Sequence, residues 1–134
     1  MLVSNILALA TVALAAPVEQ TFNGLYVTCK NKNADLFQAI NNFCGNNDIQ
    51  VPSSYGLKGA TVGNSVAWIR TQDGCPTSFV PQKYCYQQFY EMCVGGDSNG
   101  YNMNWYGVPG GDKCQVWFLN TQGRHDLQCK DDNC

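Results

Sequence analysis

The chain has 134 residues, 45% of them apolar and 13% charged, and its formal net charge at pH 7 is −2. A chain of this length forms one domain at most. Its 8 basic residues are scattered and offer no patch for phosphate backbones or anionic lipid, so we expect neither nucleic-acid nor membrane-surface binding. The 14 Asn and 10 Gln outnumber the 8 basic and 10 acidic residues, which makes the polar surface mainly neutral.

The N-terminus has the pattern of a secretory signal peptide. Residues 1–15 carry no charged side chain and contain an apolar run from Ile6 to Leu14, and we expect cleavage after Ala15. A membrane anchor would need about 20 apolar residues, and no such run follows, so membrane insertion is not expected. Residues 16–134 are then expected to form a single secreted, extracellular domain.

All the cysteines of the chain follow this leader. They are Cys29, Cys44, Cys75, Cys85, Cys93, Cys114, Cys129 and Cys134. An even number of cysteines in a secreted chain predicts four disulfides, although the spacing does not define their pairing. Zinc is the competing use of cysteine, but there is no C-x-x-C pair and His125 is the only histidine. We therefore expect no metal and no other cofactor.

The chain after the leader begins with two predicted elements. Thr21–Cys29 has the apolar content of an extended segment. Asn33 can then cap a helix, because apolar residues recur every three or four positions after it and Gly45 follows the last of them.

Two strands, a helix and two more strands are predicted next. The strands Leu57–Thr61 and Ser65–Thr71 flank a Gly-Asn pair typical of hairpins. A second helix spans Pro81–Val94, with its apolar residues on one face. Strands at Asn102–Val108 and Lys113–Asn120 are joined by a turn rich in glycine.

The last predicted segment is a polar tail, Thr121–Cys134, held by its cysteines. The order helix–strand–strand thus occurs twice along the chain. Two helices that cover one face of a small antiparallel sheet give the α+β class, so we expect one small disulfide-rich α+β domain.

Few side chains of the sequence are suited to catalysis. His125, between Arg124 and Asp126, would supply only a fragment of a ribonuclease site, and we expect it to be an exposed loop residue. Glu91 could meet a neighbouring aspartate in a glycosidase-like pair only by accident of folding. Residues 97–102 begin like a calcium loop but lack its glycine and its closing glutamate. No enzymatic activity is expected.

The most informative stretch runs from Gly95 to Tyr106. It combines polar Asp and Asn side chains with flat aromatic side chains that have polar tips. Sugars need that combination, because each ring has an apolar C–H face and an edge of hydroxyl groups. The stretch therefore predicts a shallow glycan-binding surface.

Strand alternation selects the residues of this surface. Met103 and Trp105 share one face of the strand, and the polar residues share the other. The predicted ligand-binding residues are Asp97, Asn99, Asn102, Asn104 and Tyr106. The plainer interpretation, in which Trp105 belongs to the core and the polar residues form turns, stays open.

A second candidate surface lies on the strand Ser65–Thr71. Arg70 indicates that one face reaches solvent, and Trp68 shares that face, so we add Trp68 and Arg70 to the candidate ligand-binding residues. A buried Trp68, with Arg70 at the end of the strand, is equally compatible with the pattern. Trp117 is flanked by apolar residues and is expected to be buried.

Several features together resemble a known family. They are Cys44 at the end of the first helix, the run Tyr84–Cys93 in the second, the turn Gly95–Gly100 and the run Cys114–Trp117. The chain resembles the small secreted glycan-binding proteins of mushroom-forming fungi, of the ink-cap mushroom lectin type. This resemblance implies one helix–strand–strand–helix–strand–strand domain. It also implies non-catalytic recognition of glycans or glycoproteins bearing N-acetylhexosamine or fucose, without metal.

Two other classes share much of this pattern. A secreted killer-toxin-like or host-directed effector, acting on a protein or membrane target, would have the same leader, size and disulfides. A hydrolase or ribonuclease is favoured least, because catalytic groups are scarce. The sequence also leaves open whether the protein is a homo-oligomer.

Overall fold

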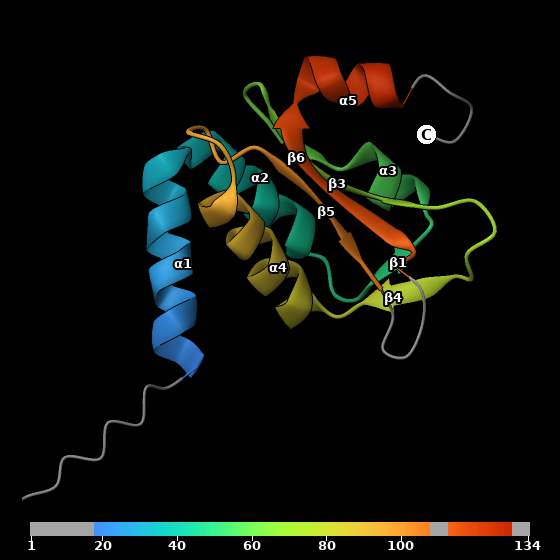
Figure 1. Cartoon of the computed structure of the whole chain (residues 1–134), viewed down its shortest axis with the longest axis horizontal. Helices are drawn as coiled ribbons and strands as arrows, with labels where there is room; N and C mark the ends of the chain where they lie inside the picture. Colours follow the sequence, from blue (N-terminus) through green and yellow to red (C-terminus); the bar gives the residue numbers. More distant parts are fainter. Residues whose placement is uncertain (1–17, 108–112, 130–134) are drawn as a thin grey trace, which may run out of the picture.

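Four antiparallel strands form the central sheet of the computed structural model (Figure 1). In spatial order they are β2 (Ala60–Val62), β3 (Ser65–Thr71), β6 (Gln115–Thr121) and β5 (Asn102–Tyr106). The structure describes residues 18–107 and 113–129. β3 and β6 pair along their whole length, from Ser65 opposite Thr121 to Thr71 opposite Gln115. These two central strands therefore join the two halves of the chain.

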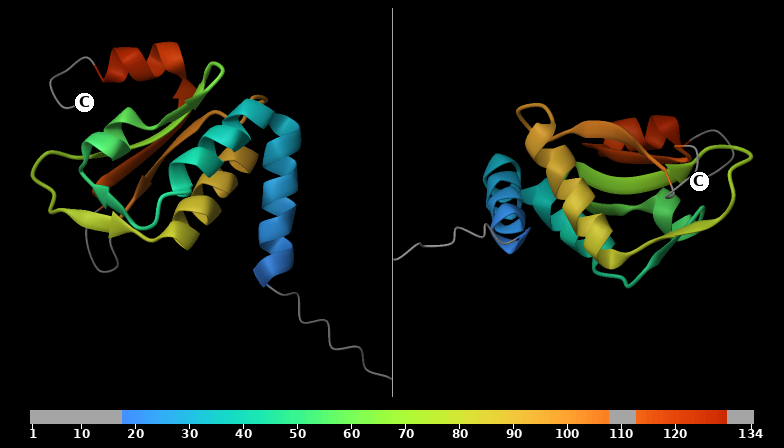
Figure 2. Two further views of the ribbon diagram at one scale, coloured as in Figure 1. Left: turned by 180° about the vertical axis from the view of Figure 1, so that it is seen from behind. Right: turned by 60° about the horizontal axis from the view of Figure 1, so that its bottom comes forward.

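Two helices, α2 (Ala34–Cys44) and α4 (Gln82–Gly95), cover one face of this sheet (Figure 2, left). α2 begins where predicted, because the Asn33 side chain accepts a hydrogen bond of 3.0 Å from the Leu36 backbone N–H. Its buried stripe packs against α4 and against the inward side chains of the sheet. The main core lies between these layers.

The opposite face of the sheet is covered by α3 (Ser54–Lys58) and α5 (Gln122–Gln128). Trp68 of β3 stacks on Phe118 of β6 with ring centroids 4.1 Å apart, and the two belong to a second, smaller core cluster. This coverage explains why β3 and β6 are buried on both faces over most of their length.

A small second sheet pairs β1 (Ile49–Val51) with β4 (Ser78–Val80), with Gln50 opposite Phe79. Neither of these three-residue strands was predicted. Their importance is positional, since β4 leads directly into α4 and places Phe79 beside the start of that helix.

The first described element, α1 (Val18–Lys32), is a helix (Figure 1), so the prediction of an extended segment at residues 21–29 is wrong. Leu25, Cys29 and Lys32 follow helical spacing, and each contacts the rest of the molecule. Leu25 packs on the main core, Cys29 is bonded to Cys93, and Lys32 binds the end of α4. Contacts with distant residues thus stabilise this segment as a helix.

The predicted α+β class and the repeated helix–strand–strand order are confirmed, as α2-β2-β3 followed by α4-β5-β6. The predicted strand at residues 57–61 is partly wrong. Ser53 caps the short helix α3 there, and β2 starts only after Gly59, whose φ of +67° ends the helix. The polar tail contains α5, which begins after the cap Thr121. The leader and the turn at residues 109–112 lie outside the described residues.

Three disulfides link distant elements: Cys29–Cys93, Cys44–Cys85 and Cys75–Cys114. Cys129 is disulfide-bonded as well, and no described cysteine is free. Cys134, the eighth cysteine, lies outside the described residues. Several disulfides in a small domain fit an extracellular protein.

Candidate functional site

Asp97 organises the loop between α4 and β5. Its carboxylate oxygen Oδ1 accepts hydrogen bonds from the backbone N–H groups of Asn99 (2.9 Å) and Tyr101 (3.0 Å). Asn33 Nδ2 donates to the Asn99 carbonyl oxygen at 2.9 Å, which ties the loop to the start of α2. Asp97 therefore shapes the turn, and Asn99 lies exposed at its tip.

Asn102 and Asn104 bind the backbone at the edge of the sheet. In the described part of the chain, β5 pairs with β6 alone. The N–H groups of Met103 and Trp105 donate instead to the side-chain oxygen of the preceding asparagine, each at 2.9 Å. Both Asn side chains are thus partly occupied by backbone hydrogen bonds.

The polar side chains of β5 face the helix layer, and its two large apolar side chains face away from it. Asn102 Nδ2 donates to the Met92 carbonyl of α4 at 2.9 Å, and the centroid of the Tyr106 ring lies 4.9 Å from that of the Trp117 ring. The predicted ligand residues of β5 therefore lie on the face of the sheet that α2 and α4 cover. Met103 and Trp105 lie on the opposite face, where they are 52% and 36% exposed. This orientation follows from the helix layers, because α4 packs on β5 from the side of Asn102, whereas α5 packs over β3 and β6 on the other face of the sheet.

Of the two alternatives for Trp68, the structure shows the buried one. Trp68 is fully buried, and its Nε1 donates to Asn120 Oδ1 at 3.1 Å beneath α5. Arg70 is exposed and lines a separate cavity of about 240 Å³ with the loop that follows β3. Trp117 is buried, as predicted.

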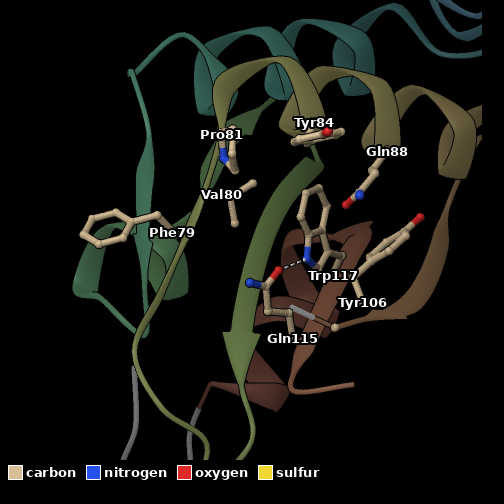
Figure 3. Close-up of a pocket in the computed structure, with 9 residues that line it drawn as sticks. Phe79, Val80, Pro81, Tyr84, Gln88, Tyr106, Gln115 and Trp117 are labelled. Atoms are coloured by element: carbon tan, nitrogen blue, oxygen red, sulfur yellow. Dashed lines mark hydrogen bonds between the residues drawn. The ribbon is translucent and has the colours of Figure 1, made fainter. Parts of the chain in front are cut away.

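A cavity of about 360 Å³ lies where β4, α4, β5 and β6 meet (Figure 3). Its described lining consists of Phe79, Val80, Pro81, Tyr84, Gln88, Tyr106, Gly107, Gln115 and Trp117. We call it the Tyr84–Tyr106 pocket. Its volume is at the small end of the range of about 300–1,000 Å³ typical of ligand pockets. All the lining residues that the structure describes are uncharged.

Aromatic side chains and one free amide surround this pocket. In Figure 3, the Tyr84 ring lies on the α4 side, Trp117 lies below it, and Tyr106 lies to one side. The Gln88 side chain extends from α4 towards Trp117 and Tyr106, and it makes no hydrogen bond to the residues that the structure describes. The pocket therefore presents ring faces beside a carboxamide that can both donate and accept.

Hydrogen bonds hold the floor of the pocket in place. Trp117 Nε1 donates to Gln115 Oε1 at 2.9 Å, and Gln115 Nε2 donates to Ser78 Oγ at 3.0 Å. The disulfide Cys75–Cys114 joins the segments that enter β4 and β6. These links connect two walls of the pocket independently of any ligand.

The Tyr106 hydroxyl is polar and protonated at neutral pH. Burial raises the pKa of Tyr106, the hydrogen bond from Asn104 lowers it, and the charge of Glu91 raises it; the net effect is upward. Asn104 Nδ2 donates to the Tyr106 oxygen at 3.3 Å, which leaves the phenolic hydrogen available as a donor. Tyr106 thus offers the pocket a ring face and a hydrogen bond.

The predicted ligand residues are divided between two cavities. Tyr106 lines the Tyr84–Tyr106 pocket, and Asn104 touches it through the Tyr106 hydroxyl. Asp97 and Asn102 line a different cavity of about 400 Å³ between β5, β6 and α5. Tyr84 and Gln88 were not among the predicted residues, although their spacing of four residues, away from the buried face of α4, indicates an aromatic and an amide side chain on one outer face of the helix.

His125 is a buried residue, so the expectation of an exposed loop histidine is wrong. Its Nε2 lies 2.8 Å from the Leu57 carbonyl oxygen, and its ring meets the Trp68 ring edge-on, with the ring centroids 4.7 Å apart.

Within the described residues, no three His, Cys, Asp or Glu side chains come together as metal ligands would. No helix of the described chain combines the length and apolarity needed to cross a bilayer.

Comparison of the chain with family models, with curated proteins and with solved structures finds no match.

Proposed function

We propose that this is a secreted carbohydrate-binding protein that binds glycans non-catalytically in the Tyr84–Tyr106 pocket. One observation carries the proposal: the uncharged lining combines the ring faces of Tyr84 and Tyr106 with the unoccupied carboxamide of Gln88. The sequence predicts this combination of an apolar face and hydrogen-bonding groups for residues 95–106, and the lining of the Tyr84–Tyr106 pocket has the same combination.

The chemistry of a sugar ring matches this lining. The apolar C–H face of a pyranose can pack on the Tyr84 and Tyr106 rings. Its hydroxyl groups can donate to the Gln88 oxygen and accept from the Gln88 nitrogen and the Tyr106 hydroxyl. Each such bond contributes about 0.5–1.5 kcal/mol after exchange with water, so we expect affinities of about millimolar to micromolar per site.

A glycan array probed with the disulfide-intact protein tests this function, followed by calorimetry on each ligand found. Tyr84→Ala and Gln88→Ala are expected to weaken binding by about 1–3 kcal/mol, because hydrogen-bonding groups of the sugar lose their partners or the ring loses its platform. Trp105→Ser, on the opposite face of the sheet, is the matched control and should bind as the parent does. The proposal is wrong if glycans bind equally well to all three variants, or to none of the proteins.

The effector class has one observation of its own. Met103 and Trp105 form an exposed apolar pair on the face of β5 opposite the pocket. Such a pair can contact a protein partner. Trp105→Ser separates the two proposals, because it should abolish an effector activity that uses this face and leave glycan binding intact.

A further inference from the structure

We infer that the Tyr84–Tyr106 pocket selects uncharged sugars over acidic ones, and that Glu91 is the residue that determines this selectivity. The inference rests on the proposed function and names the ligand class that the pocket would take. It depends on the position of Glu91 along α4 and on the absence of a cation from the described lining.

The position of Glu91 follows from helix geometry. Tyr84 and Gln88 line the pocket from α4, and Glu91 comes three residues after Gln88. Residues at spacings of three and four share one face of a helix, so Glu91 lies on the same stripe, one turn beyond Gln88 and towards β5. Gln87 Nε2 donates to Glu91 Oε1 at 3.2 Å, which holds the carboxylate at the surface of α4.

The Tyr106 hydroxyl is the group of the pocket that interacts electrostatically with the Glu91 carboxylate. Glu91 contributes to raising the pKa of Tyr106, which agrees with the placement of its charge near that side of the pocket. An acidic sugar that packs on Tyr106 would bring a second negative charge close to Glu91. Two negative charges that are brought close together repel each other, and the repulsion is strongest at low salt.

One cation lies near the pocket on the same helix and must be weighed against Glu91. The Lys83 ammonium lies 5.0 Å from the centroid of the Tyr84 ring. Lys83 is one residue from Tyr84 and therefore projects from a neighbouring face of α4, outside the described lining. Its charge is engaged with the Tyr84 ring, so we expect it to offset the repulsion by Glu91 only in part.

The experiment compares matched pairs of glycosides that differ only at C6. Methyl β-glucoside and methyl β-galactoside are titrated against methyl β-glucuronide and methyl β-galacturonide, by calorimetry or by chemical shift changes, at low and at high salt. The parent protein is expected to bind the neutral member of a pair about threefold to tenfold more tightly at low salt, and the gap should narrow at high salt.

Three variants test whether Glu91 causes the preference for neutral glycosides. Glu91→Gln is expected to raise uronide affinity about threefold to tenfold and to change the affinity for the neutral partner by less. Asp126→Asn, on α5 at the far side of the molecule (Figure 1), makes the same change in net charge and should preserve the gap. Lys83→Gln should widen the gap, because it removes the opposing charge.

The results separate this inference from the function on which it rests. Uronides that bind the parent as tightly as the neutral glycosides would overturn the inference and leave carbohydrate binding in place. A gap that Glu91→Gln and Asp126→Asn narrow equally would also overturn it, since net charge alone would explain the preference. If glycans are bound but Tyr84→Ala has no effect, the pocket is wrong, and both proposals fail.

Discussion

The Lys32 ammonium group lies 2.9 Å from the carbonyl oxygen of Val94, although 62 residues separate them in the chain. The same nitrogen also donates to the carbonyls of Cys93 (3.1 Å) and Gly96 (3.0 Å). The last carbonyl groups of a helix lack partners within the helix and carry partial negative charge. Lys32 therefore supplies the C-terminal cap of α4 from a different helix.

Removing this cap should destabilise the fold. Lys32→Met is expected to lower the free energy of unfolding by about 1–2 kcal/mol, because three backbone acceptors lose a charged donor in a half-buried site. Urea denaturation followed by tryptophan fluorescence measures the change. Lys30→Met, on the same helix and with the same loss of charge, should change stability by less than half as much. Equal effects of the two variants would contradict the capping role.

The asparagines of β5 should protect the sheet edge. Asn104→Val removes the acceptor of the Trp105 N–H and leaves that group free on an exposed edge strand, which favours pairing with another chain. We expect concentration-dependent self-association, measured by light scattering, with little change in the unfolding midpoint. Asn99→Val, in the preceding loop, is the control. A monomeric Asn104→Val protein at high concentration would contradict this role.

Stability should decrease in alkali. Burial raises the pKa of Tyr90 well above its ordinary value of 10.0, and burial also raises those of Tyr55 and Tyr106. The unfolded chain then releases these protons first, so the contribution of these tyrosines to the free energy of unfolding is fully present below about pH 10 and is lost as the pH rises further. Denaturant titrations from neutral pH to beyond pH 10 test this. Tyr90→Phe should reduce the decrease, and an unchanged slope would refute the assignment to Tyr90.

The Cys75–Cys114 disulfide should be the first of the three described bridges to be reduced. Both its cysteines are partly exposed, whereas Cys29, Cys44, Cys85 and Cys93 are fully buried. A thiolate reductant reaches an exposed sulfur faster. Brief reduction, alkylation and peptide mapping should label Cys75 and Cys114 before the buried pairs. Glycan binding should weaken at the same stage, because two walls of the pocket lose their covalent link; prior labelling of Cys44 or Cys93 would contradict this order.

Local sequence patterns predicted those helices and strands that are determined by their own residues. Asn33 with the apolar stripe after it defined α2, and alternation with a flanking turn gave the bounds of β3 as Ser65–Thr71. The helix α1 was missed because Cys29 and Lys32 owe their positions to Cys93 and Val94, which no local pattern contains. The burial of Trp68 stayed undecided for a similar reason, since the helix that covers it, α5, lies far away in the sequence.

The candidate site was only partly predictable. Tyr106 was identified from its own strand, but its neighbours in the pocket come from β4, α4 and β6, which are far apart in the sequence. Tyr84 and Gln88 have the spacing of neighbours on one face of a helix, but nothing about this pair of residue types marked it as part of a site. Alternation along β5 defined two sets of residues, but it could not say which set the helix layer would cover.

The two helix–strand–strand halves are bridged by Cys29–Cys93 and Cys44–Cys85 and by the full pairing of β3 with β6. The segment between them, Gln72–Gly74, is exposed and precedes Cys75. A protease that cuts there would yield two fragments that the two disulfides keep covalently joined, with the pairing of β3 and β6 unchanged. The backbone connection between the halves is thus dispensable once folding is complete, which makes this loop a natural point for new chain ends in a circularly permuted or two-piece version of the protein.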